Sequence, residues 1–151
     1  QYSKYSKALL NAVTGINNKD FRKLLMQYAG ERKKLIGLFK SSDYKYFSFQ
    51  LWQEGIARYT EYKFLELLDD YTPSIEVRGL TDFIPFNEFR GQFLKLHLES
   101  VTALKFETEK RVCFYDIGLA EGMLLDKLKP QWRSQYFTTR FFLEKYASEL
   151  K

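Results

Sequence analysis

Three charged residues are spaced so that they could share one face of a helix and act together. Glu54, Arg58 and Glu61 occupy positions i, i+4 and i+7 of the segment LWQEGIARYTEYKFLELLDDY. On an α-helix this spacing places the three side chains in one row. The simplest interpretation is a solvated stripe, in which Glu54 pairs with Arg58 and the pair contributes about 0.2–0.5 kcal/mol. A carboxylate in such a row could also bind a metal ion.

Gly55 follows Glu54 directly, and a solvated stripe does not explain it. A glycine inside a helix costs about 0.8–1.0 kcal/mol relative to alanine. Ala57, a second small residue, lies three positions after Glu54. Small residues beside a carboxylate leave room for a neighbour, so we expect another helix or a metal ion to approach here.

The segment WQEGIARY, residues 52–59, resembles the W-x-E-G-x-A-x-Y helix of several zincin-like metallopeptidase families. In those families the glutamate is the third protein ligand of a catalytic zinc ion. Residues 114–132 are similar to the helix-turn-helix that closes such domains, with a Y-x-x-G-x-A-E-x-x-L-L-D pattern. The resemblance implies that Glu54 is a zinc ligand. It also implies that Arg58 and Glu61 orient this ligand or anchor its helix.

A zincin site needs ligands that this chain does not contain. Catalytic zinc takes three protein ligands and keeps an open position, where the pKa of a bound water falls to about 7. Zincins take two ligands from a His-Glu-x-x-His helix, but His97 is the only histidine here. We therefore expect the carboxy-terminal part of a larger zinc peptidase acting on peptides. Its zinc would be held together with the missing amino-terminal part, and the chain alone would have no catalytic residues, no cofactor and no activity.

His97 and Cys113 have simpler structural interpretations. His97 lies between two leucines and has no second histidine with which to share a metal, so a partly buried structural role is favoured. Cys113 is the only cysteine and lies between Val112 and Phe114, which is typical of a small buried apolar residue. The sequence also has no G-x-x-x-x-G-K-[ST], G-x-G-x-x-G or G-x-S-x-G motif, which excludes the simplest nucleotide-binding and hydrolase sites.

The elements that must position these residues are predicted to be helices. The chain has 151 residues, 45% of them hydrophobic, with eight Gly and three Pro, which fits one domain over residues 1–151. Apolar spacing predicts a compact all-α bundle of five to seven helices, and it leaves room for a short extended segment near residues 73–80. Gly30 could kink or split the second helix. The predicted helices span residues 2–14, 20–39, 51–71, 87–104, 108–128 and 131–150.

Charge and apolar surface suggest which partners to expect. The formal net charge is +5, but the basic clusters are short and fit solvated helix faces, so we do not expect nucleic acid as a partner. The aromatic side chains recur at helical spacing, which favours a core. A non-enzymatic helical module that binds a protein or nucleic acid is the alternative to the peptidase. An apolar face left uncovered by the missing amino-terminal part would favour self-association.

Overall fold

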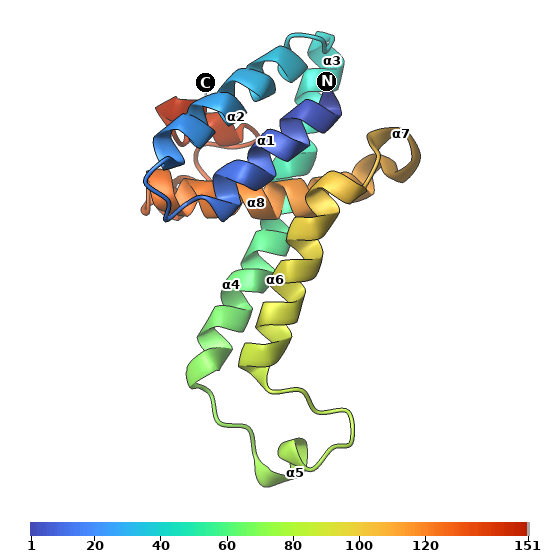
Figure 1. The fold of residues 1–151 in the computed structure, drawn as a ribbon, viewed down its shortest axis with the longest axis vertical. Helices are drawn as coiled ribbons and strands as arrows, with labels where there is room; N and C mark the ends of the chain where they lie inside the picture. The colour runs from blue at the N-terminus through green and yellow to red at the C-terminus, as the bar shows by residue number, and fades with distance from the viewer. Residues whose placement is uncertain (151) are drawn as a thin grey trace.

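Six helices of ten residues or more and two single-turn helices form the fold in a computed structural model that describes residues 1–150 (Figure 1). No β-strand occurs within these residues. The expected all-α bundle of five to seven helices is therefore confirmed. Among the described residues, no helix is both long and apolar enough to cross a membrane.

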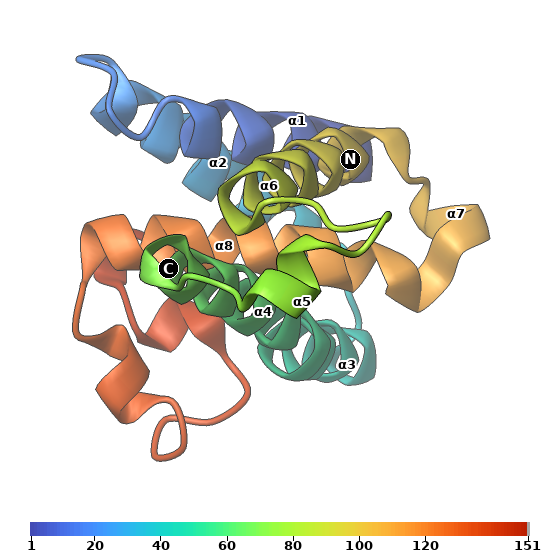
Figure 2. The same cartoon turned by 90° about the horizontal axis from the view of Figure 1, so that it is seen from below.

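α8 (Cys113–Leu128) lies at the centre and is the most buried helix. Residues on all sides of this helix are buried, which is typical of a helix in the interior of a protein. α1 and α2 pack on one side of it, while α4 and α6 cross it and project away (Figures 1 and 2). The side chains of Phe114, Ile117 and Leu124 are fully buried there, so α8 forms the middle of the core.

α1 (Tyr2–Thr14) and α2 (Phe21–Ile36) form an antiparallel hairpin. The predicted boundaries of the first helix are confirmed. The second helix ends three residues earlier than predicted, at Ile36, before Gly37. Gly30 lies inside α2 and does not split it, because a single glycine costs only about 1 kcal/mol in a helix of 16 residues.

A long helix leads from the body of the molecule into a projecting arm. α3 (Ser41–Gln50) continues through a π-helical turn (Leu51–Gly55) into α4 (Ile56–Leu67). A 3₁₀ turn at Leu68–Asp70 then ends the helix before Pro73, as predicted. α6 (Phe86–Ala103) returns beside α4, which confirms the helix predicted over residues 87–104 (Figure 1).

The end of the arm differs from the sequence prediction. The short extended segment for which the sequence left room near residues 73–80 is not formed, because a single-turn helix, α5 (Ile75–Arg78), occupies most of this stretch. The Ser74 hydroxyl caps this turn by accepting a hydrogen bond of 3.4 Å from the Val77 amide. The alternating Ile75 and Val77 are both exposed, and without a partner strand their alternation cannot form a sheet.

In the carboxy-terminal third, the helix predicted over residues 108–128 is confirmed only from residue 113 onward, and the helix predicted over residues 131–150 is wrong. The helix expected over residues 108–128 is broken into α7 (Phe106–Glu109), a 3₁₀ turn (Lys110–Val112) and α8, because Lys110 has a φ of +49°. The helix expected over residues 131–150 is instead a chain of loops and 3₁₀ turns. These turns bury Trp132, Tyr146 and Leu150 against the body, and that packing overrides the local helical pattern. The turns lie at Trp132–Gln135, Leu143–Lys145 and Ser148–Leu150.

Candidate functional site

Glu54 lies in the π-helical turn, where the long helix meets α8. π-turns are rare and frequently occur at functional sites, because they widen the helix locally and change the direction of its side chains. The Glu54 side chain is partly exposed rather than buried. Its carboxylate makes no ion pair within residues 1–150.

Gly55 and Gly118 set how closely the π-turn approaches α8. A Cβ atom at Gly55 would lie 2.5 Å from the Gly118 Cα, and one at Gly118 would lie 2.1 Å from the Gly55 Cα. Both distances are far below an ordinary contact, so only glycine fits at either position. The close approach expected beside Glu54 is therefore confirmed, and the approaching element is α8. It places Glu54 next to the first turn of that helix.

Tyr115 of α8 is a polar neighbour of Glu54. The Glu54 carboxylate beside its hydroxyl raises the pKa of Tyr115 above its ordinary value, and desolvation adds to the shift. The phenol therefore stays protonated at neutral pH and can act as a hydrogen-bond donor. The sequence pattern did not single out Tyr115, because residues 61 positions apart meet only through the glycine contact between the two helices.

Arg58 and Glu61 pair with each other rather than with Glu54. Arg58 Nη1 lies 2.7 Å from Glu61 Oε2, so the Glu54–Arg58 pair of the simple stripe is not formed. A π-turn adds one residue to a helical turn, which rotates the side chains before it by about 100° relative to those after it. The Arg58 guanidinium also lies over the rings of Phe93 and Tyr115, at 5.6 and 5.4 Å from their centroids.

His97 lies on α6 and is paired with a buried carboxylate of α8. Its Nδ1 is 2.7 Å from Asp116 Oδ1, and its ring packs at 4.3 Å from the ring of Phe93. Burial raises the pKa of Asp116, while His97 and Arg58 lower it. His97 is partly buried, as predicted. No sequence signal identified Asp116 as its partner. We call Glu54, Arg58, His97, Tyr115 and Asp116 the arm junction, because they lie where α4, α6 and α8 meet.

The described part of the chain does not complete a metal site by itself. It contains no group of three or more His, Cys, Asp or Glu residues that could hold a metal ion. Glu54 is thus a single candidate ligand, with a free carboxylate on a fixed backbone. Any further ligands would have to come from outside these residues.

A second polar cluster is buried beneath the helical hairpin. Glu121 of α8 is fully buried, and its Oε1 accepts hydrogen bonds from Tyr5 at 2.8 Å, from Arg32 at 3.1 Å and from Tyr28. Arg32 also donates to Glu144 at 2.9 Å, which ties the carboxy-terminal segment to α2. The other Glu121 oxygen has no hydrogen-bond partner among the described atoms.

This buried cluster fixes the packing of α1, α2 and α8. Burial, together with the Glu121 charge, raises the pKa of Tyr5 and Tyr28, so both phenols remain donors. The sequence pattern does not indicate this cluster, because Arg32 is followed by the exposed Lys33 and Lys34 and its local sequence gives no sign of burial. The Y-x-x-G-x-A-E-x-x-L-L-D pattern in residues 114–132 includes Glu121 but does not indicate its burial or its partners.

Comparisons with protein-family models, with curated proteins and with solved structures found no match for this chain.

Proposed function

We propose that this chain is the carboxy-terminal part of a zincin-like metallopeptidase, in which Glu54 is the third protein ligand of zinc. The observation that carries this proposal is the position of Glu54. Its carboxylate is partly exposed and lacks an ion pair within residues 1–150, and it sits on a π-turn that two glycines hold against α8. A fixed carboxylate without a cation is suited to bind one.

The neighbouring residues support a ligand role for Glu54. Because Glu61 neutralises Arg58, the arginine does not compete with a metal ion for the Glu54 carboxylate. Tyr115 retains its proton beside Glu54 and can donate to a group bound near that carboxylate. The packing of α8 against Gly55 limits the movement of the π-turn, so little ordering is required when a ligand binds.

Zinc bound by Glu54 and by two histidines of the amino-terminal part would polarise a peptide carbonyl and lower the pKa of a bound water. The residues of this chain would position the Glu54 carboxylate, which is the proposed zinc ligand. His97 stays bound to Asp116 and keeps the α6 side of the junction in place. The proposed substrate class is a peptide, and this chain without the amino-terminal part would be inactive.

The test measures bound zinc in the full-length protein from which this chain comes. We expect wild-type protein to hold about one equivalent of zinc by elemental analysis, and Glu54→Gln to lose most of it, because an amide is a poor zinc ligand. Glu66→Gln on the same helix is the matched control and should keep its zinc, since Glu66 pairs with Lys63 away from the junction. Unchanged zinc in the Glu54 variant, or a full-length sequence without a His-Glu-x-x-His upstream, would refute the proposal.

A further inference from the structure

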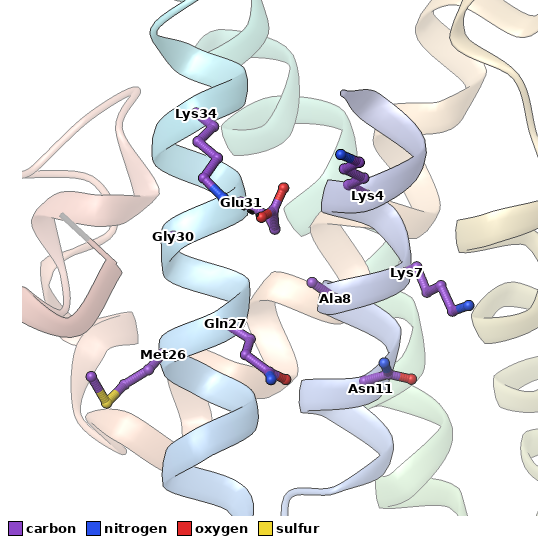
Figure 3. Close-up of a pocket in the computed structure, with 9 residues that line it drawn as sticks. All are labelled: Lys4, Lys7, Ala8, Asn11, Met26, Gln27, Gly30, Glu31 and Lys34. Atoms are coloured by element: carbon purple, nitrogen blue, oxygen red, sulfur yellow. Dashed lines mark hydrogen bonds and ion pairs between the residues drawn. The ribbon is translucent and has the colours of Figure 1, made fainter.

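A groove with a basic rim runs between α1 and α2 (Figure 3). Its volume is about 530 Å³. Lys4, Glu31 and Lys34 gather at one end, and the small residues Ala8 and Gly30 lie on either side of the middle. No atom lies within 4 Å of where a Gly30 side chain would begin, so the groove is open at its centre. We call this the α1–α2 groove.

The segment that forms this groove carries more positive than negative charge, and three of its lysines, Lys4, Lys7 and Lys34, line the groove. Residues 1–40 contain nine of the 24 Lys and Arg residues but only two of the 19 Asp and Glu residues. Lys34 is paired with Glu31 at 2.6 Å, whereas Lys4 and Lys7 make no ion pair in the part of the chain that the structure describes. Met26 projects from the outer side of α2 and is 68% exposed. The groove therefore combines the small residues Ala8 and Gly30 with two lysines that have no ion pair within residues 1–150.

The end of the arm has the opposite charge and a large apolar surface. Residues 64–89, which we call the arm tip, contain six Asp and Glu residues and a single Arg. Leu67, Ile75 and Leu80 are 75%, 76% and 57% exposed. Large apolar residues gathered on one surface usually mark a contact site. Two of the acidic residues, Glu66 and Asp69, have basic partners within the arm.

The other four acidic residues of the arm tip have no such partner, and one of them, Glu88, accepts a hydrogen bond from Gln92 instead. Asp70, Glu76 and Asp82 make no ion pair among residues 1–150. All three are exposed on the surface of the arm tip, beside its apolar side chains. The arm tip thus offers free carboxylates and apolar side chains together, which is the complement of the groove.

We propose that the arm tip of one copy of this chain docks in the α1–α2 groove of a second copy. The two surfaces lie at opposite ends of the molecule in Figure 1, so they cannot meet within one chain. In an antiparallel pair each arm reaches the groove of the partner, and both contacts close around one two-fold axis. An apolar side chain of the arm tip enters between Ala8 and Gly30, while the carboxylates of Asp70, Glu76 and Asp82 face the lysines. This inference does not rest on the proposed zinc site.

Nucleic acid is a poorer fit to the groove. No aromatic ring lines it, so it offers no surface on which a base could stack. The groove has no arginine to bind a phosphate in two hydrogen bonds, and Glu31 would repel a phosphate. An acidic and apolar protein segment matches both the charges and the open centre.

The test is a pair of charge-reversal variants in the 151-residue chain. The groove variant is Lys4→Glu, Lys7→Glu and Lys34→Glu, and the arm variant is Asp70→Lys, Glu76→Lys and Asp82→Lys. Wild-type chain should form a concentration-dependent dimer in sedimentation equilibrium, weakened by added salt. Each variant alone should raise the dimer dissociation constant at least about tenfold, and an equimolar mixture of the two should restore a dimer of wild-type affinity.

A matched control reverses charges away from the groove. Lys105→Glu, Arg111→Glu and Lys127→Glu changes the net charge as much as the groove variant does and should leave the dimer intact. Circular dichroism of each variant checks that it keeps its helix content. Three results would overturn the inference: a wild-type monomer at every concentration up to about 1 mM, a dimer that neither variant weakens, or a mixture that fails to restore pairing.

Discussion

Replacing Gly118 by alanine should destabilise the fold more than an added methyl group ordinarily does. The new Cβ would lie 2.1 Å from the Gly55 Cα and 2.6 Å from the Gly55 carbonyl carbon. Carbon atoms in contact lie about 3.5–4.0 Å apart, so the π-turn and α8 would have to separate by more than about 1 Å. Overpacking of this kind costs about 1–3 kcal/mol, and a clash with backbone belongs at the upper end. Alanine returns about 1 kcal/mol through helix propensity, which leaves a net loss of about 2 kcal/mol.

The assay is urea unfolding followed by far-UV circular dichroism, with Gly91→Ala as the matched control. Gly91 also lies inside a helix, α6, but no atom stands within 4 Å of its Cβ position. There the substitution should raise the free energy of unfolding by about 0.5–1 kcal/mol. If Gly118→Ala were as stable as wild type, the backbone contact that positions Glu54 would be refuted.

Further predictions concern polar side chains that differ in burial. Glu121→Ala should lower the free energy of unfolding by about 3–5 kcal/mol, because it removes one of the two carboxylates that pair with the buried Arg32 guanidinium. Glu61→Ala removes only a partly exposed ion pair and should cost less than about 1 kcal/mol in the same urea assay; equal losses would contradict the difference in burial. Burial and Tyr146 raise the pKa of Tyr136 from 10.0 to about 12, so its stabilising contribution is present below pH 10 and is lost as pH rises toward 12. Tyr136→Phe should therefore flatten the alkaline fall of unfolding free energy in urea titrations around pH 10, and an unchanged slope would count against this assignment.

Helix content could be predicted well from the sequence where apolar spacing and terminating residues agree. The helix over residues 2–14 ends before Gly15, and the helix in the arm ends before Pro73, as the residues indicate. Prediction failed where local pattern and packing disagree. Ile75 and Val77 alternate like a strand but have no partner strand, and Trp132 and Tyr146 are held in loops by their burial against the body.

The candidate site could be predicted only in part. Gly55 beside Glu54 indicated a close approach, but the sequence could not show that Gly118 was the other half of it. The prediction that Glu54, Arg58 and Glu61 form one row assumed a regular helix. The π-turn changes which of these side chains meet, so that Arg58 pairs with Glu61. This π-turn packs against the neighbouring helix α8, and the spacing of residues along the sequence does not show such contacts between helices.

The sequence by itself determined the all-helical class, the approximate limits of most helices and the importance of Gly55 beside Glu54. These features follow from local propensity and apolar periodicity, which act over a few residues. The tertiary structure decided the pairing of His97 with Asp116, the burial of Arg32 with Glu121, and the separation of a basic groove from an acidic arm tip. Each of these depends on residues far apart in the chain, and only the packing of helices around α8 brings those residues together or holds them apart.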